Sequence, residues 1–158
     1  MAALDDRAQQ IICRICLRPL AHVVTEGYRG HVGTWQHHEV DRKHEDHKPE
    51  VVTLAELPPG TRIRYRCDFC LDEDVVRVLR ARDFAVAREH GSVGNWGACE
   101  PCADLIDAGD WDALATRASE AHCKREVFAS RHIVERNMRT LYGKLRKHAL
   151  NTRTEVIG

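Results

Sequence analysis

The spacing of the cysteines constrains the fold of this chain more than any other feature of its sequence. Six of the seven cysteines form three C-x-x-C pairs: Cys13 with Cys16, Cys67 with Cys70, and Cys99 with Cys102. Two thiols at this spacing can bind one metal ion from a tight turn, and a tetrahedral site joins two such elements. The pattern therefore predicts metal sites built from segments that lie far apart in the chain, with Cys123 left over.

Histidines supply the ligands that the first cysteine pair lacks. Six of the ten histidines lie in one window that follows this pair and contains no cysteine: His22, His31, His37, His38, His44 and His47. We predict a closed first zinc site made of Cys13, Cys16, His37 and His47. His38 competes with His37, and His44 competes with His47; the sequence leaves both choices open.

The other two cysteine pairs predict a second zinc site of Cys67, Cys70, Cys99 and Cys102. They are separated by 28 residues, more than the roughly 15–20 of the commonest four-cysteine spacing, and an inserted hairpin would absorb the difference. The alternative joins the first pair to the second and leaves the third pair to find His90, His122 or Cys123.

Local patterns predict short elements around these sites. Alternating polar and apolar residues predict a strand at 61–66, and the runs at 75–80 and 84–87 predict two more. A helical pattern follows the third cysteine pair. Leu57-Pro-Pro-Gly60 predicts a linker over residues 49–60. We expect an α+β chain of two small zinc-stapled β-hairpin units, at 8–50 and 61–117, followed by a long basic amphipathic helix at 118–150.

The predicted C-terminal helix has an apolar stripe and a cationic remainder. Its stripe consists of Val127, Val134, Met138, Leu141 and Leu145. Its cations are Arg125, Arg131, Arg136, Arg139, Lys144, Arg146 and Lys147. Gly143 costs about 1 kcal/mol relative to alanine, so we expect the helix to bend or break there.

Charge is distributed unevenly along the chain. Residues 1–116 contain 14 Lys and Arg against 20 Asp and Glu, whereas residues 117–158 contain 10 against 4. This asymmetry predicts that the C-terminal cations bind nucleic acid phosphates or an acidic protein surface, with Arg62, Arg64 and Arg66 as possible additions. The alternative is that the basic helix packs on the acidic part of its own chain or of a second copy, as a homodimer.

Two enzymatic interpretations of the cysteines fail on the sequence. The run from Trp96 to Cys102 is typical of a thioredoxin-like redox site. Such folds use a cis-proline downstream of the thiol pair, whereas no proline follows Pro101 in this sequence. The negative charge of Glu100, between the two cysteines, also disfavours a thiolate. Zinc-dependent deamination requires H-x-E followed by P-C-x-x-C, whereas Glu39 directly follows His38 and Ala98 precedes the third pair.

A nuclease interpretation remains as an alternative. Asp46-His47-Lys-Pro49, flanked by cysteine pairs, resembles the D-H-x-P motif of HNH nucleases. The resemblance implies that His47 is a general base that activates water against a phosphodiester. The Asn or His that this family places after the second pair is missing, because Leu71-Asp-Glu-Asp74 stands there.

Further resemblances point to zinc fingers. The segment from Cys67 to about Ala115, with a thiol pair on a knuckle, a hairpin and a pair at a helix start, resembles the treble-clef class. The C-x-x-C…W-x-H…D-H-x-P run, Ala81-Arg-Asp-Phe84 and the Trp96–Trp111 run resemble the short tandem zinc-finger proteins, treble-clef or zinc-ribbon in type, of high-GC bacteria and their phages. This resemblance implies zinc and a regulatory or interaction role, and it brings no activity with it.

We therefore expect a non-enzymatic module with two Zn²⁺ per chain, a regulatory adaptor that contacts nucleic acid or the machinery bound to it. A protein-only adaptor or a dimerising structural zinc protein is the alternative. The first residues carry acidic side chains and no apolar signal-peptide core, and no stretch reaches 18 uncharged apolar residues. These features predict a cytoplasmic protein without a membrane span.

Overall fold

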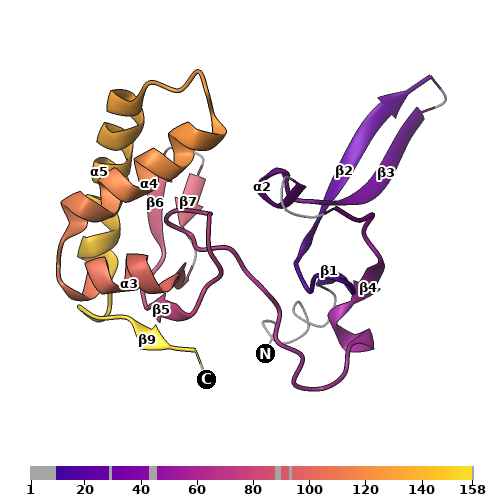
Figure 1. Ribbon diagram of the computed structural model, residues 1–158, viewed down its shortest axis with the longest axis horizontal. Helices are drawn as coiled ribbons and strands as arrows, with labels where there is room; N and C mark the ends of the chain where they lie inside the picture. The colour runs from indigo at the N-terminus through magenta and orange to yellow at the C-terminus, as the bar shows by residue number, and fades with distance from the viewer. Residues whose placement is uncertain (1–9, 29, 43–45, 88–89, 93, 158) are drawn as a thin grey trace. The chain divides into compact units, whose positions relative to one another are not determined.

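The chain forms two compact units, Met1–Tyr65 and Arg66–Gly158. The computed structural model describes residues 10–28, 30–42, 46–87, 90–92 and 94–157 (Figure 1). Both units contain small antiparallel sheets and helices, so the expected α+β class is confirmed. Among the described helices, none has the length and apolar character needed to cross a membrane.

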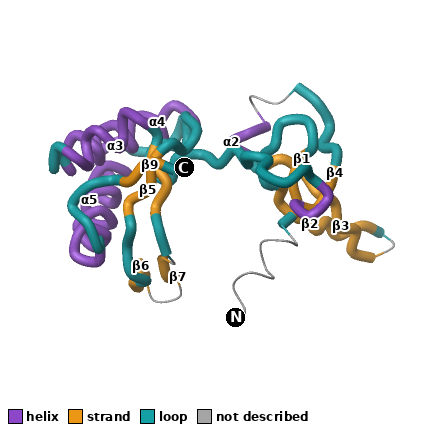
Figure 2. Tube along the Cα trace, turned by 90° about the horizontal axis from the view of Figure 1, so that it is seen from below, coloured by secondary structure: helices purple, strands orange, loops and turns teal. Residues whose placement is uncertain are grey.

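The first unit consists of two separate strand pairs. β1 (Ile11–Cys13) pairs with β4 (Val51–Thr53), and β2 (Leu20–Gly27) pairs with β3 (Gly30–His37). The short helix α2 (Glu39–Arg42) follows β3, and the 3₁₀ helix η1 (Leu54–Glu56) follows β4. Figure 2 shows β2 and β3 as a two-stranded ribbon that extends away from β1 and β4.

The segment expected to be a linker, residues 49–60, instead completes the first unit. Val52 of β4 is buried and pairs with Ile12 of β1, because two adjacent β-branched residues favour a strand. Glu56 then accepts a hydrogen bond from the Thr53 backbone N–H at 2.6 Å, which starts η1. The strand predicted at 61–66 does not form: Arg66 makes an isolated antiparallel bridge with Asp74, and residues 61–65 have no regular structure. Within this segment the Arg64 N–H donates to Leu17 O at 2.8 Å.

A buried ion pair fixes the helix of the first unit. Arg18 and Asp41 of α2 are 2% and 4% exposed, and the Arg18 Nε lies 3.5 Å from the Asp41 Oδ1. The guanidinium also donates to Arg64 O at 3.4 Å. The ion pair therefore connects the turn after the first cysteine pair, α2 and the 61–65 segment.

The described residues of the second unit form a three-stranded sheet, a hairpin and three helices. The sheet order is β8 (Trp96–Ala98), β5 (Arg77–Leu79) and β9 (Glu155–Val156), and β6 (Phe84–Ala87) pairs with β7 (His90–Ser92). The helices are α3 (Glu100–Asp107), α4 (Trp111–Arg125) and α5 (Arg131–His148). The strands expected near 75–80 and at 84–87 are thus present, as is the helix after the third cysteine pair.

The region expected to be one helix at 118–150 contains the end of α4, a loop at 126–130 and α5. The two helices run antiparallel, because contacts join Glu120 to Arg131, Thr116 to Glu135 and Asp112 to Arg139. The loop lets both helices pack their apolar faces on one core, which a continuous helix could not do. Val127 therefore lies in the loop and is 82% exposed, and α5 continues through Gly143 without a break.

The core of the second unit combines this helical pair with aromatic side chains. Phe69 lies against Trp96 and Tyr142, with both centroid distances at 5.4 Å. Leu145 of α5 is fully buried in the same cluster. Trp96 donates its indole N–H to the Ser92 Oγ at 2.8 Å, so it is a partly buried core residue.

Leu145→Ala should destabilise the second unit by about 2–5 kcal/mol, because it leaves a cavity beneath α5. Denaturant unfolding monitored by circular dichroism measures the change. Asn137→Ala, at an exposed position of the same helix, should change stability by less than about 0.5 kcal/mol. Equal stability of the two variants would show that α5 does not pack through Leu145.

Candidate metal centres

The structure brings Cys13, Cys16, His37 and His47 together in the first unit. Their ligand atoms all lie within 4.8 Å of one another. The Cys13 Sγ is 3.3 Å from the His47 Nε2, and the Cys16 Sγ is 3.4 Å from the His37 Nε2. Four ligands about 2.0–2.3 Å from a shared tetrahedral centre lie about 3.3–3.8 Å apart, so one ion fits among these atoms.

The structure also bears on the other histidines that follow the first cysteine pair. His38, the competitor of His37, is exposed and does not belong to the cluster. His22 lies against Trp35 of the β2–β3 ribbon, with the two rings tilted to each other and their centroids 4.8 Å apart. His44, the competitor of His47, lies outside the described residues. The described part of the structure therefore favours His37 over His38 and places His47 among the four.

The same turn presents the first and second cysteine pairs. Leu17 and Leu71 each follow the second cysteine of a pair, and both have a φ of 58°, the only positive φ values of described non-glycine residues. Each leucine N–H donates to the carbonyl of the first cysteine in its pair, at 2.8 and 3.0 Å. A left-handed residue costs about 1–2 kcal/mol, and the turn in return places both sulfurs on one side. The repeated C-x-x-C-Leu pattern was the sequence signal for it.

The second cluster consists of Cys67, Cys70, Cys99 and Cys102. All four are at most 1% exposed, and their sulfurs lie within 4.8 Å of one another. The Cys70 and Cys99 sulfurs are 3.7 Å apart, close to the separation across a tetrahedral ion. Cys123 is not a member; its thiol faces the Ala129 carbonyl at 3.9 Å. The second and third pairs therefore meet in one site, as the sequence predicted, and the alternative pairing does not occur.

The third pair lies at the start of α3. Cys99 is the N-cap, Pro101 lies in the first turn, and the Ala103 N–H donates to the Cys99 carbonyl at 2.9 Å. Proline is suited to this turn because its missing N–H would have no helical partner. The positive end of the helix dipole favours thiolates here.

The four cysteines of the second cluster share protons through hydrogen bonds between their sulfurs. Hydrogen bonds from Cys102 and then Cys67 lower the pKa of Cys70, whereas Cys67 and Cys70 raise the pKa of Cys102. Four adjacent sulfurs cannot all carry negative charge, so some keep their protons. A divalent cation would let all four ionise. Metal binding there displaces protons, and metal affinity rises with pH.

In the first cluster, burial opposes ionisation of Cys13, but hydrogen bonds outweigh it. The Cys16 backbone N–H, the His47 side chain and the Glu50 backbone together lower the Cys13 pKa to about 6. The Cys13 sulfur is therefore a thiolate at neutral pH, which is the form that binds metal.

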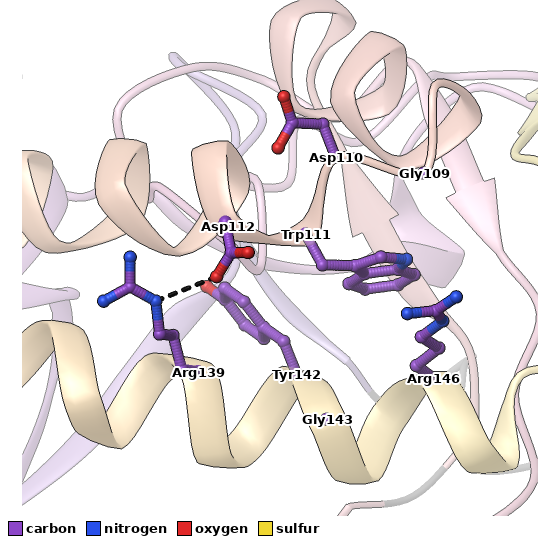
Figure 3. Close-up of a pocket in the computed structure, with 8 residues that line it drawn as sticks. All are labelled: Gly109, Asp110, Trp111, Asp112, Arg139, Tyr142, Gly143 and Arg146. Atoms are coloured by element: carbon purple, nitrogen blue, oxygen red, sulfur yellow. Dashed lines mark hydrogen bonds and ion pairs between the residues drawn. The ribbon is translucent and has the colours of Figure 1, made fainter.

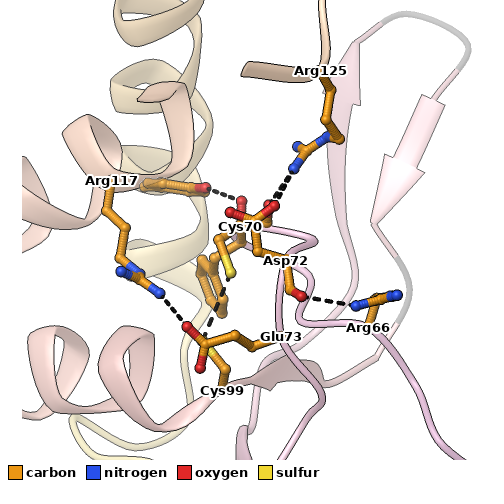
Figure 4. Close-up of polar contacts among 9 residues, drawn as sticks. Arg66, Cys70, Asp72, Glu73, Cys99, Arg117 and Arg125 are labelled. Atoms are coloured by element: carbon orange, nitrogen blue, oxygen red, sulfur yellow. Dashed lines mark hydrogen bonds and ion pairs between the residues drawn. The ribbon is translucent and has the colours of Figure 1, made fainter. Parts of the chain in front are cut away.

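Arginines of α4 surround the second cluster (Figure 4). Arg125 donates to the Cys70 carbonyl and to Asp72, both at 2.8 Å, and Arg117 pairs with Glu73 at 2.7 Å. Burial by itself lowers the pKa of Arg117, but a hydrogen bond to Cys102 and the charges of Cys102 and Cys70 outweigh it and raise that pKa. The guanidinium thus balances the negative charge of the sulfurs.

Each of the two donor sets fits its own metal ion, since each offers four nitrogen or sulfur ligands at tetrahedral separations. Comparison with protein-family models, with curated proteins and with solved structures finds no match for this chain. The chemistry of the two clusters therefore carries the functional argument.

His37→Gln and His47→Gln should each reduce the metal content from two ions per chain to one, because a site with three ligands binds zinc far more weakly. Plasma mass spectrometry with amino-acid analysis measures the ratio. His38→Gln is the matched control and should retain two ions. Two ions in the His47→Gln protein would place His47 outside the site, as the general-base hypothesis requires.

Arg117→Met should weaken metal binding at the four-cysteine site about tenfold or more, because partners of ligating groups typically contribute that much. Chelator competition on the His47→Gln background, which is expected to keep only this site, isolates the effect. Arg80→Met removes an exposed cation that pairs with Glu155 at 2.7 Å and should leave affinity unchanged. Equal chelator sensitivity of the two variants would rule out charge balance by Arg117.

Proposed function

We propose that this chain is a non-enzymatic module in which two Zn²⁺ ions each close one compact unit. The observation that carries the proposal is the pair of clusters, one of two cysteines and two histidines and one of four cysteines, with ligand atoms at tetrahedral separations. Zinc is the ion that both donor sets suit, since tetrahedral S₂N₂ and S₄ sites are typical of it. Four protein ligands fill each ion's coordination and leave no open position for catalysis.

We further propose that the second unit is a treble-clef zinc finger. Three features support this: the first thiol pair lies on a turn, the β6–β7 hairpin follows, and the last pair lies in the first turn of α3. The short tandem zinc-finger proteins whose motifs this sequence resembles would then be its relatives.

Several of the C-terminal cations contact groups of their own chain, which leaves fewer of them for the proposed binding surface. Arg125 and Lys144 donate to backbone carbonyls, and Arg131 and Arg139 pair with carboxylates. These contacts support the packing interpretation for four of the seven predicted cations. Within the described part of the chain, the other three form no ion pair: Arg136, Arg146 and Lys147.

These three cations lie on the exposed face of α5. Arg136, Gly143 and Lys147 follow one another at helical spacing, and Arg146 lies beside them. The one carboxylate of α5, Glu135, pairs with Arg139 at 2.8 Å and accepts from Thr116. A row of cations that form no ion pair with described residues fits regularly spaced phosphates, so we propose that the module is an adaptor that contacts nucleic acid through this face.

Arg136→Gln/Lys147→Gln should lower nucleic acid affinity and reduce the slope of log affinity against log salt by about 1–2, because each substitution removes one cation that binds a phosphate. Fluorescence anisotropy with a labelled single strand and a matched duplex, at several salt concentrations, measures both. Arg80→Gln changes the charge of the same unit at an ion-paired position and should keep the slope. Absent or salt-independent binding by the wild type would favour a protein-only adaptor.

A further inference from the structure

A pocket opens beside the cationic face of α5. Its volume is about 240 Å³, and it lies between the turn that joins α3 to α4 and one face of α5 (Figure 3). This volume is below the roughly 300–1,000 Å³ of sites that enclose a drug-sized ligand, so the pocket suits a single flat ring. Its aromatic ring is that of Trp111, and its cations are Arg139 and Arg146. Gly143 leaves one wall open, because it has no side chain.

We propose that this Trp111 pocket receives one base of a single-stranded nucleic acid, stacked on Trp111, with the adjoining phosphate at Arg146. The proposal rests on the proposed nucleic acid function and names the form of nucleic acid that the surface selects. Aromatic side chains beside cations are the general means by which proteins bind single strands.

Gly143 keeps the pocket open. A Cβ at this position would meet no atom within 4 Å, and its φ is not positive, so neither packing nor backbone geometry requires glycine. Glycine is among the least favourable residues in a helix interior. Its effect here is to leave space between Trp111, Arg139 and Arg146, which a larger side chain would fill.

The carboxylates of the pocket have partners of their own, which reduces their repulsion of an anion at Arg146. Asp112 accepts from the Arg139 Nε at 3.0 Å, and Asp110 caps α4 by accepting from the Ala113 N–H at 3.0 Å. Arg146 forms no ion pair with the residues that the structure describes. Figure 3 shows its guanidinium beside the Trp111 indole, where one cation can contact both a stacked base and its phosphate.

The recess selects a single strand over a duplex. Bases in a duplex are covered by their neighbours in the stack, and only an unstacked base can enter a recess and lie against an aromatic ring. Gly143 lies between Arg136 and Lys147 on the same helix face. A strand whose phosphates contact these two cations therefore passes over the pocket.

Gly143→Leu tests the proposal without endangering the fold, because leucine fills open space and favours the helix. We expect an unfolding temperature equal to or above that of the wild type. Affinity for a fluorescein-labelled 12-nucleotide oligothymidylate should fall on the order of tenfold, the effect of removing one stacked base. Affinity for a 12-base-pair duplex should stay unchanged. Asn137→Leu adds the same bulk at an exposed position outside the pocket and should change neither affinity.

Other outcomes would separate this proposal from the broader one. If Gly143→Leu binds the single strand as tightly as the wild type does, the proposal that a base enters the pocket is overturned. The nucleic acid function would still stand in that case if Arg136→Gln/Lys147→Gln reduces the salt slope. An equal decrease for strand and duplex would overturn base stacking. Failure of the wild type to bind either probe would overturn both proposals, as would tighter binding of oligoglutamate, which would indicate an acidic protein partner.

Discussion

The gathering of four sulfur or nitrogen ligands in each unit is the constraint on which the rest of this structure depends. In the first unit, Cys13 and Cys16 form a small buried cluster with Leu20, and Ile12 and Val52 are also buried. In the second unit, four sulfurs lie at the centre of a larger apolar cluster. A cation held by either cluster would cross-link segments that lie far apart in the chain, and units with few apolar side chains commonly require such a cross-link.

The two units support their clusters by different means. The first has little apolar material, and the buried Arg18–Asp41 ion pair holds α2 to the turn that carries the thiols. The second has a helical pair, and Arg125 and Tyr142 reach from it to the carbonyls of Cys70 and Phe69. The charge asymmetry of the sequence is therefore partly internal, because much of the C-terminal positive charge meets acidic groups of its own unit. What remains on the surface is a short cationic row beside an aromatic pocket.

Ligand spacing was predictable because the chemistry of a metal site restricts residue types and because C-x-x-C turns are local. The same eight residues proposed from the sequence are those that the structure gathers into two groups. The wrong predictions concern segments whose structure is decided by packing against residues far away in the sequence. Residues 49–60 look like a linker through their prolines, yet Val52 forms a strand because Ile12 lies opposite it. The stripe that includes Val127 predicts one helix, yet the need to cover a single core from two sides places a loop there.

By itself, the sequence determined the number and composition of the clusters, the mixed α+β class and the excess of cations near the end of the chain, since these follow from residue types and short-range spacing. Only the tertiary structure decided which of these cations form ion pairs within the chain. Arg125, Arg131 and Arg139 resemble Arg136 and Arg146 in the sequence. The antiparallel packing of α4 and α5 brings Glu120 to Arg131 and Asp112 to Arg139, and the turn after the second cysteine pair brings Asp72 to Arg125. Partners from distant segments cannot be read from local patterns, because each depends on where another helix lies.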